Sequence, residues 1–239
     1  MNPTHAQASD ANDTRVILQR RRYRADAGNK DIDGSFSRYM TVPTREPHSE
    51  RFAEALREAA LWVSERGVAR PRLAHGRLAA TLVVETEADP ELAVAALLHD
   101  VAEHEIDDAR MRAVRDRFGE RVARVVAWCS ENGTHPMPPF RGLDEYRVAE
   151  LLCATRDTLV VAAADTVAAL RILVDDLGRG PVEAVSSPAT AAAAIWFLGE
   201  VAGAIQDRLP GHALAAETVA VTAVVTTALS RRAPLSAAS

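Results

Sequence analysis

The stretch from Ala95 to His104 joins an apolar helical pattern to an abrupt group of polar side chains. It reads AALLHDVAEH, so apolar residues are followed by polar side chains in the last turns of a predicted helix. On a helix His99 shares a face with Glu103, and Asp100 shares one with His104, because residues four apart are neighbours. Buried charges need either a partner or a metal ion. The stretch therefore indicates a site for metal binding or catalysis at one end of a helix.

Two residues elsewhere in the chain extend this group. His75 lies near the start of the preceding predicted helix, and an antiparallel hairpin brings the start of one helix beside the end of the next. Asp165 follows the apolar run 159–164, where burial without a partner would force a carboxylate towards its neutral form. A bound cation would offset the free-energy cost of burying the charged carboxylate. We therefore predict one metal ion bound by His75, His99, Asp100 and Asp165.

The predicted ligands also indicate the chemistry of the site. Two neutral imidazoles and two carboxylates suit Mn²⁺, Fe²⁺ or Zn²⁺ and leave positions open for water and a phosphate oxygen. A bound ion of this kind polarises a phosphoryl group and lowers the pKa of bound water. Glu103, one helical turn beyond His99, is placed to orient or deprotonate that water. His104 could act as an acid or base near neutral pH, or simply fill the rim of the site.

Each of these residues also has an ordinary structural interpretation. His75 alone could be a capped surface histidine, and Asp165 could pair with Arg171 or another buried arginine. Glu103 and His104 could form a solvated helix end. We favour the metal site because the ordinary interpretations require several coincidences, in the right order, on separate helices.

Helical periodicity places the predicted ligands on a bundle. Apolar residues recur at three- and four-residue steps, and Asp89-Pro90-Glu91 combines the N-cap, the first-turn proline and the acid that favour a helix start. No stretch alternates as a strand would. We predict an all-α fold of about nine helices: 49–65, one opening at Pro71, 90–104, 108–117, 120–130, 143–154, one capped by Asp157 and running to Leu177, 190–208 and 212–229.

The two ends of the chain differ from this helical part. Residues 1–47 are polar, lack helical periodicity and carry a basic cluster at Arg20–Arg22, so we expect a flexible extension. A solvated tail is a better explanation of the cluster than contact with nucleic acid. We expect residues 48–232 to form the domain that carries the site and residues 233–239 to form a disordered tail.

Composition narrows the classes of partner. A net charge of −5 gives no general attraction to nucleic acid or to an anionic membrane. The start of the chain has no apolar signal segment, so we expect a soluble cytoplasmic protein. Cys129 and Cys153 lack the paired spacing of a zinc site, and we expect both to be small core residues. The alanine-rich C-terminal helix could pack within the bundle or, in a homo-oligomer, against a second subunit.

Four segments resemble the HD-domain hydrolases of the RelA/SpoT type, particularly the small stand-alone alarmone hydrolases related to the Mesh proteins. The resemblance covers about Phe52 to Leu177 and extends in outline to the C-terminal helices. The segments that carry it are Pro71–His75, Leu97–Glu103, Phe118–Val122, and Ala164-Asp165 with Leu170-Arg171.

This resemblance implies a specific activity and roles for named residues. The family removes the 3′-pyrophosphate from guanosine tetra- and pentaphosphate, usually with manganese, inside an all-α fold. It implies that Glu103 acts on the attacking water and that His75, His99, Asp100 and Asp165 bind the metal. Arg66, Arg70 and Arg72 are the candidates for contact with a base or phosphate. With no synthetase-like segment after Leu177, any role in the stringent response would be degradative.

Departures from the family pattern leave the substrate open. His104 stands where the family has an acid, and Thr166, Ala168 and Ala169 stand where it has larger polar side chains. Three functions remain. The first is hydrolysis of an alarmone nucleotide, and the second is hydrolysis of another nucleotide by an HD phosphohydrolase. The third is a catalytically degenerate module that binds metal or nucleotide for regulation.

Overall fold

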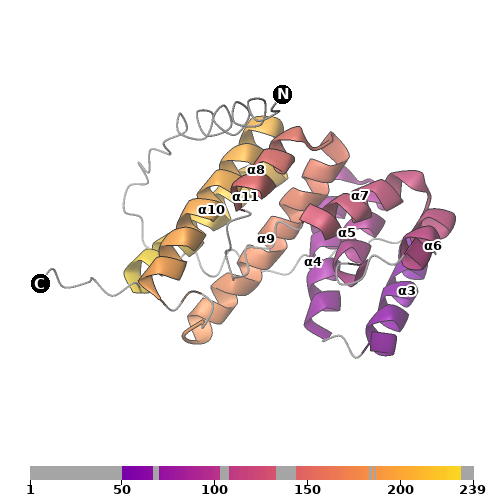
Figure 1. Cartoon of the computed structure of the whole chain (residues 1–239), viewed down its shortest axis with the longest axis horizontal. Coiled ribbons are helices and arrows are strands. Elements are labelled where there is room, and N and C mark those ends of the chain that lie inside the picture. The colour runs from indigo at the N-terminus through magenta and orange to yellow at the C-terminus, as the bar shows by residue number, and fades with distance from the viewer. Residues whose placement is uncertain are drawn as a thin grey trace, which may run out of the picture. The chain divides into compact units, whose positions relative to one another are not determined.

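Helices account for nearly all of the chain that the computed structural model describes, which comprises residues 50–66, 70–102, 108–132, 144–182, 185 and 187–232. Within those residues there are nine α-helices and no strand (Figure 1). They are α3 (Glu50–Arg66), α4 (Arg70–Glu87), α5 (Pro90–Ala102), α6 (Asp108–Phe118), α7 (Glu120–Asn132), α8 (Asp144–Cys153), α9 (Arg156–Arg179), α10 (Pro188–Arg208) and α11 (Ala213–Arg232). The predicted all-α bundle is confirmed.

The start of α5 is formed as the sequence predicts. One carboxylate oxygen of Asp89 accepts hydrogen bonds from the backbone N–H groups of Glu91, at 3.0 Å, and Leu92, at 3.2 Å. These N–H groups have no partner within the helix, so the cap stabilises its first turn. Gly119 separates α6 from α7 with a φ of +93°, a conformation that a side chain would disfavour.

The start of α9 differs from the prediction. Thr155, and not Asp157, is the N-cap residue, and its hydroxyl accepts the backbone N–H of Thr158 at 3.3 Å. Asp157 is the second residue of the helix, two positions beyond the cap, and instead forms an ion pair with Arg121 of α7, at 2.7 Å. The carboxylate still lies near the positive end of the α9 dipole, where a negative charge is favourable.

Two helices form the interior of the bundle. α5 packs against α3, α4, α7 and α9, and every described side chain from Leu92 to His99 is buried. α9 is buried continuously from Thr158 to Ala168 and lies between two groups of helices (Figure 1). α4, α5 and α7 contact it on one side, and α10 and α11 on the other. Because both helices are apolar on nearly all faces, a polar side chain on either one is conspicuous.

The C-terminal helices form a second apolar cluster with the later half of α9. Its buried members are Leu170, Leu173, Val174, Leu177, Val185, Ala194, Leu198, Val221, Val225 and Leu229. By length and composition alone, α10 and α11 could each cross a membrane. The apolar windows of the two helices are 44% and 39% buried, and buried residues such as Leu198 and Val225 pack one face of each helix against the bundle.

Other predictions have mixed outcomes. Cys129 is buried as expected, but the prediction for Cys153 is wrong, because that thiol is exposed at the last residue of α8. The predicted extension, residues 1–47, and the predicted tail, residues 233–239, lie outside the described residues.

Candidate metal centre

Three of the predicted ligands meet in the interior of the bundle. His75 comes from the second turn of α4, His99 from the end of α5 and Asp165 from the middle of α9. Their exposed fractions are 6%, 2% and 3%. One ligand atom from each residue can be chosen so that all three atoms lie within 4.8 Å of one another. The three segments therefore converge as the sequence predicts.

The contacts centre on one oxygen of Asp165. Its Oδ1 atom lies 3.2 Å from Nε2 of His75 and 3.0 Å from Nε2 of His99. The two imidazole rings are arranged edge to face, with centroids 5.7 Å apart and planes at 71°. Both rings therefore direct the same nitrogen towards the same carboxylate oxygen.

The backbone of α5 determines which nitrogen of His99 can bind a metal. Nδ1 of His99 lies 2.7 Å from the carbonyl oxygen of Ala96. A carbonyl only accepts hydrogen bonds, so Nδ1 carries the proton and donates it. In the neutral ring, Nε2 then has a free lone pair, directed at Asp165. A backbone acceptor on the far side of the ring is the usual way in which a metal-binding histidine is oriented.

The three donor atoms fit a divalent metal ion. Two lone pairs that face each other at 3.0 Å repel unless a proton or a cation lies between them. Bonds of about 2.1 Å place neighbouring ligands of one ion about 3 Å apart when they meet at a right angle. The observed separations of 3.0 and 3.2 Å match that spacing. Two imidazoles and a carboxylate could therefore bind a metal ion here.

A contact from α7 supports the end of α5 beside this cluster. The hydroxyl of Ser130 donates a hydrogen bond to the backbone carbonyl of His99 at 3.2 Å. That carbonyl lies in the last turn of α5, where the helix itself supplies no donor. This role of Ser130 has no signal in the sequence, because serine is common on solvated helix faces.

An ion-pair network ties together the other ends of the helices that carry His99 and Asp165. Arg121 donates two hydrogen bonds to Asp157, at 2.7 and 3.0 Å, and one to Asp89 at 2.9 Å. The hydrogen bonds from Arg121 hold the pKa of Asp157 below its ordinary value, although partial burial opposes the shift. The network fixes the start of α5 against the start of α9.

The remaining predicted site residues lie partly or wholly outside the described part of the chain. Asp100 lies on α5, one residue after His99, but its side chain is not described. Glu103 and His104 lie outside the described residues altogether. Three arginines lie at the end of α3 or in the first turn of α4 with undescribed side chains: Arg66, Arg70 and Arg72. Their roles remain predictions.

Of the ordinary interpretations of Asp165, the pairing with Arg171 is now excluded. Arg171 does not pair with Asp165; its guanidinium forms an ion pair with Glu217 of α11. Thr166 and Ala168 are completely buried, and the Thr166 hydroxyl donates to the carbonyl of Ala162 at 2.8 Å. Two of the three positions on α9 that depart from the family pattern therefore face the core.

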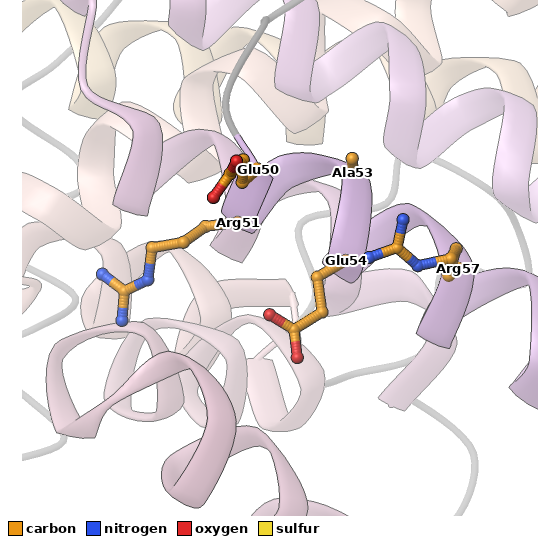
Figure 2. A pocket seen from close by; sticks show the side chains of 5 residues that line it. All are labelled: Glu50, Arg51, Ala53, Glu54 and Arg57. Atoms are coloured by element: carbon orange, nitrogen blue, oxygen red, sulfur yellow. The ribbon is translucent and has the colours of Figure 1, made fainter.

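A separate hollow lies on the first two turns of α3, with a volume of about 480 Å³. Figure 2 shows the residues that line it, which are Glu50, Arg51, Ala53, Glu54 and Arg57. Arg51 is engaged in helix packing there, donating to Glu91 at 2.9 Å and to the carbonyl of Phe118 at 3.3 Å. None of the three converging ligands lines this hollow, so it is not the metal centre.

Comparison with known proteins agrees with the geometry. Residues 52–187, more than half of the chain, match the family described as HD domain. The matched region contains all three converging ligands. No curated protein matches the sequence. The chain therefore belongs to the HD-domain family, whose members are typically metal-dependent hydrolases.

Proposed function

We propose that this protein is a metal-dependent phosphohydrolase that cleaves a pyrophosphate or phosphate ester of a nucleotide, with guanosine tetraphosphate as the first substrate to test. The observation that carries the proposal is the convergence of two imidazole Nε2 atoms on one buried carboxylate oxygen, at 3.0 and 3.2 Å. Membership of the HD-domain family supports the same class of reaction. The resemblance to alarmone hydrolases supplies the candidate substrate.

The proposed metal ligands are His75, His99, Asp100 and Asp165. A divalent ion bound there would polarise a phosphoryl group and lower the pKa of a bound water. We propose manganese, because the resembled family usually uses it; iron and zinc also suit these ligand types. Asp100 adjoins His99 on the last turn of α5, so its carboxylate is the natural fourth donor.

The proposed chemistry is attack of water on phosphorus. A bond forms between the water oxygen and phosphorus, and the bond from phosphorus to the ester oxygen of the nucleotide breaks. Glu103 would accept the proton of the water, and His104 could return a proton to the departing oxygen. Arg66, Arg70 and Arg72 would bind the negative charge of the phosphates or contact the base. The products are pyrophosphate, or phosphate, and the shortened nucleotide.

The burial of Thr166 and Ala168 favours a second candidate, hydrolysis of a different nucleotide. Both side chains are completely buried, so neither is available to contact a substrate. The resembled family has larger polar groups at these positions. A substrate bound without those contacts would be recognised by other residues, and its base or sugar could then differ from that of guanosine tetraphosphate.

The test combines metal content with product release. We expect about one divalent metal per chain, and pyrophosphate or phosphate release from guanosine tetraphosphate or another member of a nucleotide panel. We expect Asp100→Ala to abolish both metal binding and hydrolysis, because it removes a negatively charged ligand. Asp116→Ala is a matched control, since Asp116 is an exposed carboxylate on α6. Replacing Arg66, Arg70 or Arg72 by alanine should raise KM and leave the metal content unchanged.

The outcomes separate the candidate functions. Turnover of other nucleotides, but not of guanosine tetraphosphate, would favour the second candidate. One bound metal without turnover of any nucleotide would favour a regulatory module that has lost catalysis. A wild-type chain that binds no divalent metal would remove the basis of the proposal.

A further inference from the structure

Gly76 lies at a close approach of the two helices that carry the histidines. A Cβ atom added to Gly76 would lie 2.7 Å from the carbonyl oxygen of Leu97, on α5. It would also lie 3.5 Å from the carbonyl carbon of Leu97 and 3.6 Å from the carbonyl oxygen of Ala96. Cβ atoms essentially never come within 3.0 Å of a heavy atom from another part of the chain, so the two helices would have to move apart.

The obstacle at this contact is backbone. A flexible side chain could rotate away from an added methyl group, but the Leu97 carbonyl belongs to the helical ladder of α5. Ordinary contact begins at 3.4 Å, so the helices would have to separate locally by about 0.7 Å, the difference between 3.4 and 2.7 Å. The absence of a side chain at Gly76 is therefore what permits the observed approach.

The contact also adjoins both proposed histidine ligands along the chain. Gly76 directly follows His75, and Leu97 lies two residues before His99. The Ala96 carbonyl, which the added Cβ would approach, is the group that accepts the Nδ1–H of His99 at 2.7 Å. One small patch of α5 backbone thus limits the approach of α4 and orients the His99 ring.

Other glycines on the described helices are not constrained in this way. A Cβ added at Gly178, Gly199 or Gly203 would meet no atom within 4 Å. Alanine favours helices more than glycine does, so a glycine in the interior of a helix usually lowers stability. At Gly76 the close approach of α5 explains why glycine occupies the position although it lowers the stability of the helix.

We infer that Gly76 is a positioning residue of the metal centre: it sets the separation of α4 and α5 that allows His75 and His99 to bind the same ion. The inference rests on the metal site of the proposed function, and it does not depend on which nucleotide is hydrolysed. Metal sites tolerate displacements of only about 0.5 Å before binding weakens, which is less than the shift that a Cβ would impose.

The test compares Gly76→Ala with Gly199→Ala in the full-length chain. After removal of metal, the dissociation constants for Mn²⁺ and Co²⁺ are measured by competition with a chelator. The visible absorption spectrum of the Co²⁺ form reports the geometry of its ligands. Urea unfolding of the metal-free proteins reports folding. Gly199→Ala is matched because it makes the same change inside a helix where a Cβ meets nothing.

We expect Gly76→Ala to weaken metal binding by about tenfold or more, the usual effect of disturbing the groups that support metal ligands. We also expect an altered Co²⁺ spectrum in a chain that still unfolds cooperatively. Gly199→Ala should keep the wild-type metal affinity and spectrum. A wild-type affinity and spectrum in Gly76→Ala would overturn the inference.

The remaining outcomes are also decisive. A Gly76→Ala chain that stays unfolded with and without metal would count against the inference, because Gly76 would then serve folding in general. Folding of that variant on addition of metal, with the wild-type spectrum, would also overturn it. Wild-type protein that binds no metal would defeat the proposed function itself, whereas metal binding without nucleotide turnover would leave the role of Gly76 intact.

Discussion

Two histidine–carboxylate contacts in this protein have opposite hydrogen-bonding arrangements. At the start of α11, Nδ1 of His212 accepts the backbone N–H of Leu214 at 3.1 Å, so Nε2 carries the proton and donates it to Glu87. In the metal centre, Nδ1 of His99 donates to the Ala96 carbonyl, so Nε2 of the neutral ring presents a lone pair to Asp165. The first contact is a complete hydrogen bond, and the second needs a proton or a cation between its atoms.

The charge around Glu87 fits its structural role. Arg156 donates two hydrogen bonds to it, both at 2.9 Å. These bonds are the largest cause of a lowered pKa for the Glu87 carboxyl, while burial opposes the shift and His212 adds to it. The cluster joins the end of α4 to the starts of α9 and α11. A histidine–carboxylate pair with little exposure to solvent therefore does not by itself identify a metal site, and the backbone partner of the far ring nitrogen helps to separate the two roles.

The largest expected effect is that of Asp165→Ala on metal binding. The substitution removes the oxygen to which both rings point, so stabilisation by added metal should disappear. In the wild-type chain that stabilisation should be about 2.7 kcal/mol when the free metal is 100 times its dissociation constant. Urea unfolding with and without Mn²⁺ measures it. Glu87→Gln should retain the full effect of metal, and an equal loss in both variants would contradict the proposed difference between the two contacts.

A smaller effect is expected from Glu87→Ala on the metal-free protein. This change leaves the Arg156 guanidinium and the His212 N–H without their acceptor, and we expect the free energy of unfolding to fall by about 1–3 kcal/mol. Urea unfolding of the metal-free chain tests it. Arg115→Ala serves as a control for loss of an exposed ion pair, since Arg115 and Glu120 are both about half exposed, and should cost at most about 1 kcal/mol. A Glu87→Ala chain as stable as wild type would show that this cluster contributes little.

The sequence predicted the helices and the convergence of the ligands because both follow from local patterns. Apolar periodicity and the Asp89 cap placed α5, and the positions of His75, His99 and Asp165 on apolar helices indicated a shared site. The ring tautomers could not be predicted, because they depend on backbone partners. The contact of His212 with Glu87 was not predicted, because both residues lie at helix ends, where polar side chains are ordinary.

One misassignment and one overlooked residue have the same origin. Asp157 and Thr155 both suit the start of a helix, and only the position of Arg121 shows why the aspartate is used for an ion pair instead. Gly76 did carry a signal that could have been used, since a glycine inside an otherwise good helical pattern calls for a reason. The reason itself, the Leu97 carbonyl, became visible only when α4 and α5 were placed together.

Acid should weaken the carboxylate networks in a predictable direction. The pKa values of Glu87 and Asp157 are lowered in the folded protein from their ordinary values of 4.5 and 3.8. The stability that the two carboxylates contribute is therefore complete when the pH lies above those ordinary pKa values. That stability is lost as the pH falls through the lower pKa values that the two carboxyl groups have in the folded protein. The free energy of unfolding of the metal-free chain should therefore decrease as the pH falls below about 5. Glu87→Gln should reduce that slope, and an unchanged slope would argue against a lowered pKa for Glu87.

The smallest expected effect is that of Ser130→Ala. The hydroxyl of Ser130 is the donor for the His99 carbonyl, at 3.2 Å, and its loss should lower the free energy of unfolding by about 0.5–1.5 kcal/mol. The carbonyl belongs to a proposed metal ligand, so the end of α5 should also become less rigid and the affinity for Co²⁺ should fall by a few-fold. Thr226→Ala removes a hydroxyl from an exposed helix face and is the control. If both variants lower the metal affinity equally, the hydrogen bond from Ser130 is not what supports His99.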